Sequence, residues 1–157
     1  ANVDRIQPDR RIMKKYLLLL LLVVTPLKAE IYDIGQLDLN SYKGKVVYFD
    51  FWASWCKPCR ESFPWMNSMI DKYPADKFTV ITINLDADSS EMQRFLGKFP
   101  ANFDVYQDSS GGIAEKFQLE AMPTSYLIDS NGEILRKHIG FYTRKIEEYE
   151  REIEELL

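Results

Sequence analysis

The stretch that most constrains the fold is the apolar run Val46–Trp52, followed closely by the only two cysteines, Cys56 and Cys59. The run is apolar apart from Asp50, which is typical of a strand covered by helices on both faces. The cysteine spacing predicts a strand-to-helix junction, because residues three apart share one helix face and their sulfurs can meet.

We expect a helix to begin at Cys56, where free backbone N–H groups stabilise an anion. Such a position lowers the pKa of a thiol, so Cys56 is the predicted nucleophile. Cys59 lies one turn further in and is expected to be more covered, which suits a thiol that resolves a mixed disulfide. The pair is therefore interpreted as a redox centre.

Two other interpretations of the cysteine pair are weaker. A structural zinc site needs four ligands, but the chain offers one histidine, His138, and no further cysteine. An inert disulfide between residues three apart closes too small a loop to constrain the unfolded chain much. We expect His138 to be a strand or surface residue and no metal to be bound.

The run Asp50–Cys59 has the sequence DFWASWCKPC, and Pro64 stands in the helix that follows it. This pattern closely resembles the thioredoxin superfamily. The apolar stretch near the N-terminus and the long segment between Asp86 and Pro123 point to the TlpA-like, or ResA-like, periplasmic branch. The resemblance implies a thioredoxin-like α/β fold, in which helices flank a central mixed β-sheet and a βα insertion precedes a cis-proline loop.

The resemblance gives Asp50 the role of a buried acid near the second cysteine, where it accepts the proton of Cys59 during exchange. Thioredoxins pair this acid with a lysine on the neighbouring strand, and strand alignment places Thr82 there instead. Without that ammonium group, desolvation is expected to raise the pKa of Asp50, which suits a general base near neutral pH. The alternative is a solvated, idle carboxylate at an open strand end.

The remaining roles also come from the resemblance. Lys57 is expected to tune the redox potential, because its positive charge stabilises a nearby thiolate. Trp55 is expected to cover the dithiol and Gly140 to line a substrate groove, although a packed aromatic and a turn glycine are the plainer interpretations. The predicted substrate-binding residues are Trp55, Pro58, Met122, Pro123 and Gly140.

Some members of the branch carry an acidic residue near the dithiol, in the loop after the second central strand. Asp86 and Asp88 occupy that loop here, but we expect them to be solvated, as most loop aspartates are.

Hydrophobic periodicity and turn residues predict the other elements. The Asn131-Gly132 turn between two apolar runs is a strong hairpin signal. The predicted strands are an edge strand within 31–40, strands over 78–85 and 103–107, and hairpin strands over 124–128 and 133–139. The predicted helices run from the cysteines to 73, over 112–117 and over 143–157. A further helix, opened by a Ser90/Gln93 capping box, follows the strand over 78–85.

The N-terminal residues read as a secretory signal peptide over 13–29, with Lys14 and Lys15 before a short apolar run and cleavage expected after Ala29. Residues 1–12 precede Met13 and are interpreted as upstream or added residues. Residues 30–157 are then one thioredoxin-like domain in an oxidising compartment, periplasmic or secreted, or membrane-anchored if the signal stays uncleaved.

Charge excludes one class of function. Residues 30–157 hold 14 Lys and Arg against 22 Asp and Glu, and an acidic domain without a basic patch is a poor nucleic-acid binder.

The prediction is a monomeric thiol–disulfide oxidoreductase without a cofactor or stable membrane insertion. It exchanges disulfides with protein substrates, is recharged by a redox donor, and acts mainly as a reductant, as in cytochrome c maturation. The alternatives are a thiol peroxidase on the same fold and a copper-binding or purely binding module.

Overall fold

A computed structural model describes residues 30–157. The interpretations of residues 1–12 and of the signal peptide over 13–29 lie outside the described residues. No helix within 30–157 has the length and apolar character needed to cross a membrane.

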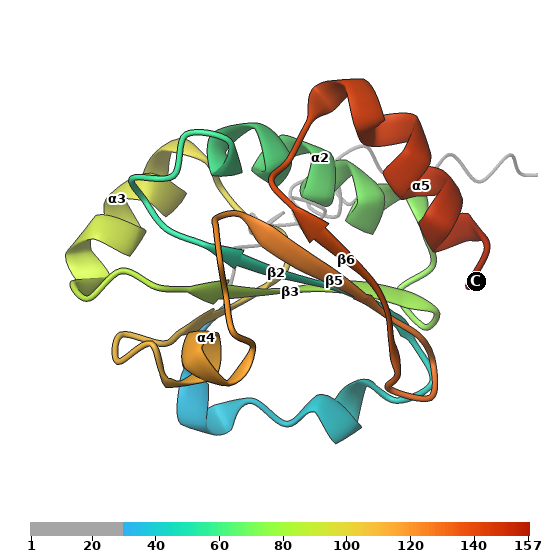
Figure 1. Ribbon diagram of the computed structural model, residues 1–157, viewed down its shortest axis with the longest axis horizontal. Coiled ribbons are helices and arrows are strands. Elements are labelled where there is room, and N and C mark those ends of the chain that lie inside the picture. The colour runs from blue at the N-terminus through green and yellow to red at the C-terminus, as the bar shows by residue number, and fades with distance from the viewer. Residues whose placement is uncertain (1–29) are drawn as a thin grey trace, which may run out of the picture.

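A six-stranded mixed sheet forms the centre of the domain, in the spatial order β1-β4-β3-β2-β5-β6 (Figure 1). The first four strands in this order run parallel to one another, β5 pairs antiparallel with β2, and β6 pairs antiparallel with β5 at the edge of the sheet. The strands are β1 (Ile31–Asp33), β2 (Val46–Trp52), β3 (Phe78–Asn84), β4 (Asp104–Gln107), β5 (Thr124–Ile128) and β6 (Ile134–Ile139).

Helices and loops cover both faces of the sheet. Three helices lie on one face, and a short helix and the N-terminal segment with its 3₁₀ turns lie on the other (Figure 1). The helices are α2 (Cys59–Lys72), α3 (Ser89–Lys98), α4 (Gly112–Lys116) and α5 (Ile146–Glu154), and the 3₁₀ turns are η1 (Ile34–Gln36), η2 (Leu39–Tyr42) and η3 (Thr143–Lys145). Strand β4 and helix α4 are the predicted βα insertion before the proline loop.

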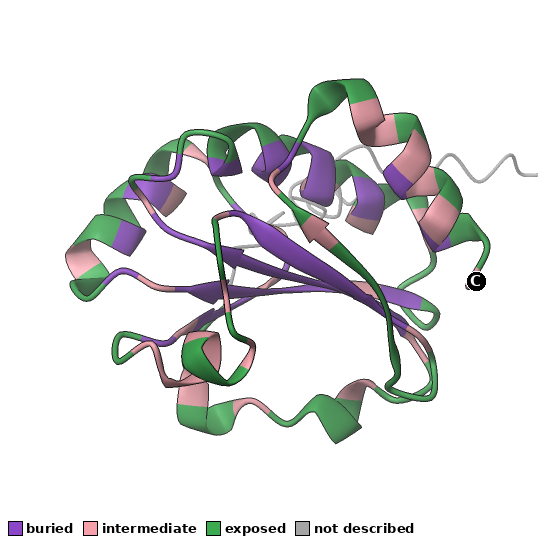
Figure 2. Ribbon diagram, in the orientation of Figure 1, coloured by how far each residue is buried: buried purple, intermediate pink, exposed green. Residues whose placement is uncertain are grey.

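Strand β2 is central, and all of its residues are buried (Figure 2). Successive side chains of a strand point to opposite faces, and the two hydrophobic clusters divide β2 in this way. Val46, Tyr48 and Trp52 pack in the cluster beneath α2, α3 and α5, whereas Val47, Phe49 and Phe51 pack in the cluster covered by α4. Asp50 alternates with Tyr48 and Trp52, so it belongs to the face that α2 covers.

The predicted fold class, strands and hairpin are confirmed, but the start of α3 differs from the expectation. The predicted Ser90/Gln93 capping box does not form. Asp88 is the N-cap instead, and its side chain accepts a hydrogen bond from the backbone N–H of Ser90 at 2.8 Å. An aspartate two residues before a free N–H reaches it with one short side chain, so the N-cap lies two residues before the predicted Ser90 and the helix begins at Ser89.

Candidate active site

The two cysteines form a disulfide at the start of α2, with an S–S distance of 2.00 Å. The expectation that the helix begins at Cys56 is wrong, because α2 begins at Cys59 and Pro58 is its N-cap. Cys56 lies in the preceding turn, where its N–H donates to the carbonyl of Ala53 at 3.0 Å. The backbone N–H of Cys59 donates to Cys56 Sγ at 3.3 Å. The Cys56 sulfur therefore still contacts a free N–H of the helix end, although it stands outside the helix.

The two cysteines differ slightly in exposure, in the direction expected for a nucleophile and a resolving thiol. Cys56 is 3% exposed and Cys59 is fully buried. Of the two cysteines, only Cys56 therefore has any surface that a partner can reach. The flanking residues Lys57 and Pro58 are exposed, which leaves their side chains open to a partner.

Asp50 is an isolated acid in the interior. It is 1% exposed, and its Oδ2 has no hydrogen-bond partner among the described residues. Burial raises the pKa of this carboxyl well above its usual value, because removal from water penalises the charged form. The register places Thr82 beside Asp50, as predicted. The alternative of a solvated carboxylate at an open strand end is wrong.

The loop before β5 contains a cis peptide bond between Met122 and Pro123. Met122 packs against the hydrophobic cluster that includes both cysteines. The carbonyl of Pro123 accepts a hydrogen bond from the N–H of Gly140 at 2.8 Å. Gly140 has a φ of +80°, and a Cβ there would stand 3.0 Å from the hydroxyl of Tyr142. A glycine is needed at this turn, and it ties the end of β6 to the proline loop.

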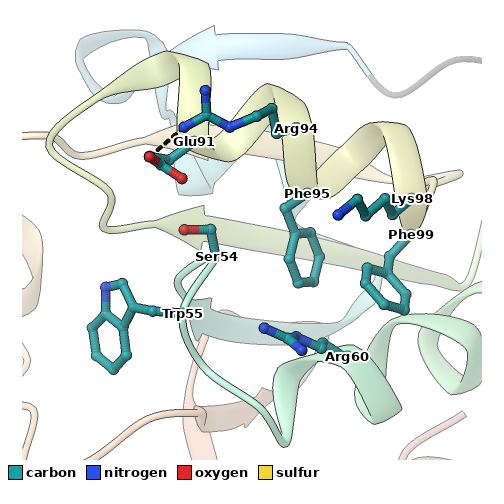
Figure 3. A pocket seen from close by; sticks show the side chains of 8 residues that line it. All are labelled: Ser54, Trp55, Arg60, Glu91, Arg94, Phe95, Lys98 and Phe99. Atoms are coloured by element: carbon teal, nitrogen blue, oxygen red, sulfur yellow. Dashed lines mark hydrogen bonds and ion pairs between the residues drawn. The ribbon is translucent and has the colours of Figure 1, made fainter.

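Trp55 is 68% exposed and stands at one side of a groove between the start of α2 and helix α3 (Figure 3). Most of its indole is open to solvent, so the structure does not show it as a packed core aromatic. Its predicted role as a cover for the dithiol stays a prediction.

Asp86 is a residue whose contribution the sequence reasoning missed. It was expected to be solvated, but it is buried at 4% exposure. Its Oδ2 accepts from the N–H of Ser54 at 2.9 Å and from the side chain of Asn84 at 2.8 Å, and its Oδ1 accepts from the Ser54 hydroxyl at 2.9 Å. This network fixes the turn that leads to Cys56. The signal available in the sequence is the pair of polar residues, Asn84 and Asp86, where the buried strand β3 ends.

His138 lies apart from the dithiol, on β6. Its Nε2 is 2.7 Å from Oε2 of Glu152, on α5. Within residues 30–157, no three His, Cys, Asp or Glu side chains gather in an arrangement that could hold a metal ion.

A family model described as the AhpC/TSA family matches residues 24–137. The chain belongs to this family. ResA, a thiol-disulfide oxidoreductase of Bacillus thuringiensis subsp. konkukian, is 32% identical over 132 residues, which are 83% of this chain and 73% of that protein.

Two solved structures support the same assignment. A Chlorobium tepidum protein, provisionally named thiol:disulfide interchange protein DsbE, is 46% identical with a TM-score of 0.74, over 76% of this chain and 85% of that one. The exposed lipoprotein thioredoxin Etrx1 of Streptococcus pneumoniae is 29% identical with a TM-score of 0.64, over 75% of this chain and 90% of that one. The family member described here is thus a thiol–disulfide oxidoreductase of the ResA and DsbE type, as the resemblance to the TlpA-like branch implied.

Proposed function

We propose that this chain reduces disulfides in partner proteins through Cys56, with Cys59 as the resolving thiol and Asp50 as its base. In the reduced protein, the Cys56 thiolate attacks one sulfur of the partner disulfide, forms a mixed disulfide and releases the other partner sulfur as a thiolate. Asp50 then accepts the Cys59 proton, and the Cys59 thiolate attacks Cys56 Sγ. The partner leaves with two thiols, and the protein keeps the disulfide.

The observation that carries this proposal is the isolated Asp50 carboxyl on the α2 face of β2. A general base works best when its pKa lies near the operating pH, and burial moves the pKa of Asp50 upward. The buried Cys59 thiol needs such a base, because water does not reach it. The slightly accessible Cys56 and the exposed Lys57 and Pro58 support an encounter with a protein on that side.

The proposal includes a setting outside the cytoplasm. The basic and apolar pattern over 13–29 supports export, and the relative from Streptococcus pneumoniae is described as an exposed lipoprotein. The TlpA-like resemblance supports a reductant, with the thiols that receive haem in cytochrome c maturation among its substrates. A monomer recharged by a separate thiol donor would suffice for this cycle. Lys57 would tune the potential, and Trp55, Pro58, Met122, Pro123 and Gly140 would contact the substrate.

The reduction potential of the Cys56–Cys59 pair tests the direction of electron flow. The fraction of reduced protein is measured after equilibration with mixtures of reduced and oxidised glutathione. We expect a value closer to the about −270 mV of thioredoxin than to the about −120 mV of DsbA. A Cys59→Ser variant, which cannot form the internal disulfide, is the control for the measured fraction of reduced protein. A potential near that of DsbA would overturn the reductant role and assign disulfide donation instead.

A further inference from the structure

A groove of about 420 Å³ opens beside the dithiol, between the start of α2 and helix α3 (Figure 3). We call it the basic groove, and its lining residues are Ser54, Trp55, Arg60, Glu91, Arg94, Lys98, Phe95 and Phe99. Trp55 directly precedes Cys56, and Arg60 directly follows Cys59. The groove is therefore lined by residues that flank both cysteines in the chain.

The charge of the groove is opposite to that of the domain. Arg60, Arg94 and Lys98 line it, with Glu91 as the one acidic group, and Glu91 is paired with Arg94. Arg60 and Lys98 form no ion pair with the part of the chain that the structure describes. Residues 30–157 as a whole carry an excess of eight acidic groups, 22 against 14. Two cations without an ion-pair partner therefore lie in a groove whose net charge is opposite to that of the domain.

The floor of the groove is aromatic. Phe95 is buried and Phe99 is partly buried, and both rings point from α3 toward the side on which Arg60 lies (Figure 3). Apolar walls lower the local dielectric, which strengthens the attraction between the cations and an anionic group that enters. Volumes of this size accommodate a few side chains of a bound segment.

We propose that the basic groove docks an acidic segment that flanks the reactive cysteine of the protein substrate, with Arg60 and Lys98 as the recognising cations. The proposal rests on the proposed function, because the segment belongs to the substrate of the Cys56–Cys59 pair. Charge complementarity gives selectivity at this position, since the acidic remainder of the domain repels an acidic chain elsewhere and the groove attracts it at the dithiol.

Three peptides test this. Each carries one cysteine as a mixed disulfide with 2-thiopyridine, and the two residues on each side of the cysteine are Asp, Asn or Lys. The reduced protein is oxidised to its Cys56–Cys59 disulfide as each peptide disulfide is reduced to a peptide thiol and thiopyridone, whose absorbance gives the rate. The readout is the ratio of second-order rate constants for the Asp and Asn peptides, so that each variant is its own control.

We expect the Asp peptide to react about threefold to tenfold faster than the Asn peptide at low salt, and the Lys peptide to react more slowly than either. The preference should shrink as salt is added. In the double variant Arg60→Gln, Lys98→Gln the ratio should fall to one or below. Lys77→Gln is the matched control. It removes an exposed lysine that directly precedes β3 and does not line the groove, so this variant should keep the ratio.

The outcomes separate the two proposals. If no peptide is reduced, the proposed function fails and the docking proposal fails with it. If all three peptides react equally, or if the double variant keeps the preference, the docking proposal alone is overturned. If inorganic phosphate abolishes the preference at an ionic strength where chloride does not, the groove is a phosphate site, and the docking proposal is overturned as well.

Discussion

Thr82 and Asp50 are direct neighbours in the parallel register of β2 and β3, but the Thr82 hydroxyl makes its hydrogen bonds elsewhere. It accepts from the indole N–H of Trp52 at 3.1 Å and donates to the carbonyl of Asp104 at 3.4 Å. Among the described residues, nothing donates to Asp50 Oδ2. The acid is therefore isolated by burial, and Thr82, its register partner on β3, is engaged elsewhere.

The stability of the oxidised protein should report this isolation through its dependence on pH. The folded pKa of Asp50 is raised, so stability is full below the unfolded pKa of about 4 and falls as pH rises toward the folded pKa. Asp50→Asn removes this loss, and its free energy of unfolding relative to the parent should increase from pH 4 to pH 7 by about 1 kcal/mol or more. Urea unfolding across that range measures the difference.

Asp88→Asn is the matched control for this measurement, because the contribution of Asp88 to stability depends on pH with the opposite sign. Hydrogen bonds from Ser90 lower the pKa of Asp88, so its contribution is present above the unfolded pKa and is lost as pH falls. A difference between Asp50→Asn and the parent that stays flat with pH would contradict a raised pKa for Asp50.

Asp50→Asn should also slow the resolving step. Without a proton acceptor, the buried Cys59 thiol deprotonates less readily, and loss of a general base costs about 100-fold or more in rate. Stopped-flow mixing of the reduced variant with a peptide disulfide should show normal formation of the mixed disulfide and slow release. Equal slowing of both steps would mean that Asp50 acts on Cys56 as well.

The two cysteines should differ in what they trap. Cys59→Ser leaves the more accessible sulfur without a resolving partner, so a mixed disulfide with a partner protein should accumulate. Cys56→Ser leaves only the fully buried Cys59 and should trap little. Mass spectrometry of the intact adducts under non-reducing conditions measures both, and a larger adduct yield with Cys56→Ser would reverse the assigned roles.

Asp86→Ala should destabilise the domain because it leaves the partly buried N–H of Ser54 and the buried amide of Asn84 without their acceptor. We expect a loss of about 1 to 3 kcal/mol in the free energy of unfolding. The turn before Cys56 should also exchange its amide hydrogens faster. Asp88→Ala removes the N-cap of α3 and should affect that helix end instead, as hydrogen exchange resolved by segment would show.

Thr82→Val keeps the volume at a buried position and removes the hydroxyl that pairs with Trp52. The buried indole N–H then lacks an acceptor, which should cost about 1 to 3 kcal/mol of stability. The dependence of stability on pH should not change, because Thr82 makes no hydrogen bond to Asp50. A changed dependence would show that the hydroxyl influences the carboxyl after all.

Local sequence determined much of this molecule. The apolar run over 46–52, the Asn131-Gly132 turn and the periodicity of the helices predicted the strands, hairpin and helices. These features depend on backbone geometry and on side-chain spacing over a few residues. The register of Asp50 with Thr82 was also predictable, since two buried parallel strands of similar length leave few alignments.

The start of α2 is set locally, by the turn closed by Ala53 and Cys56, which moves the helix start to Cys59. Tertiary structure alone decided the burial of Asp86 and the basic groove. Burial of Asp86 is tolerated because Ser54, 32 residues earlier in the chain, donates hydrogen bonds to it. The groove joins residues next to the cysteines to residues of α3. The burial of Asp86 and the groove both depend on contacts between distant segments, whose energies no local pattern encodes.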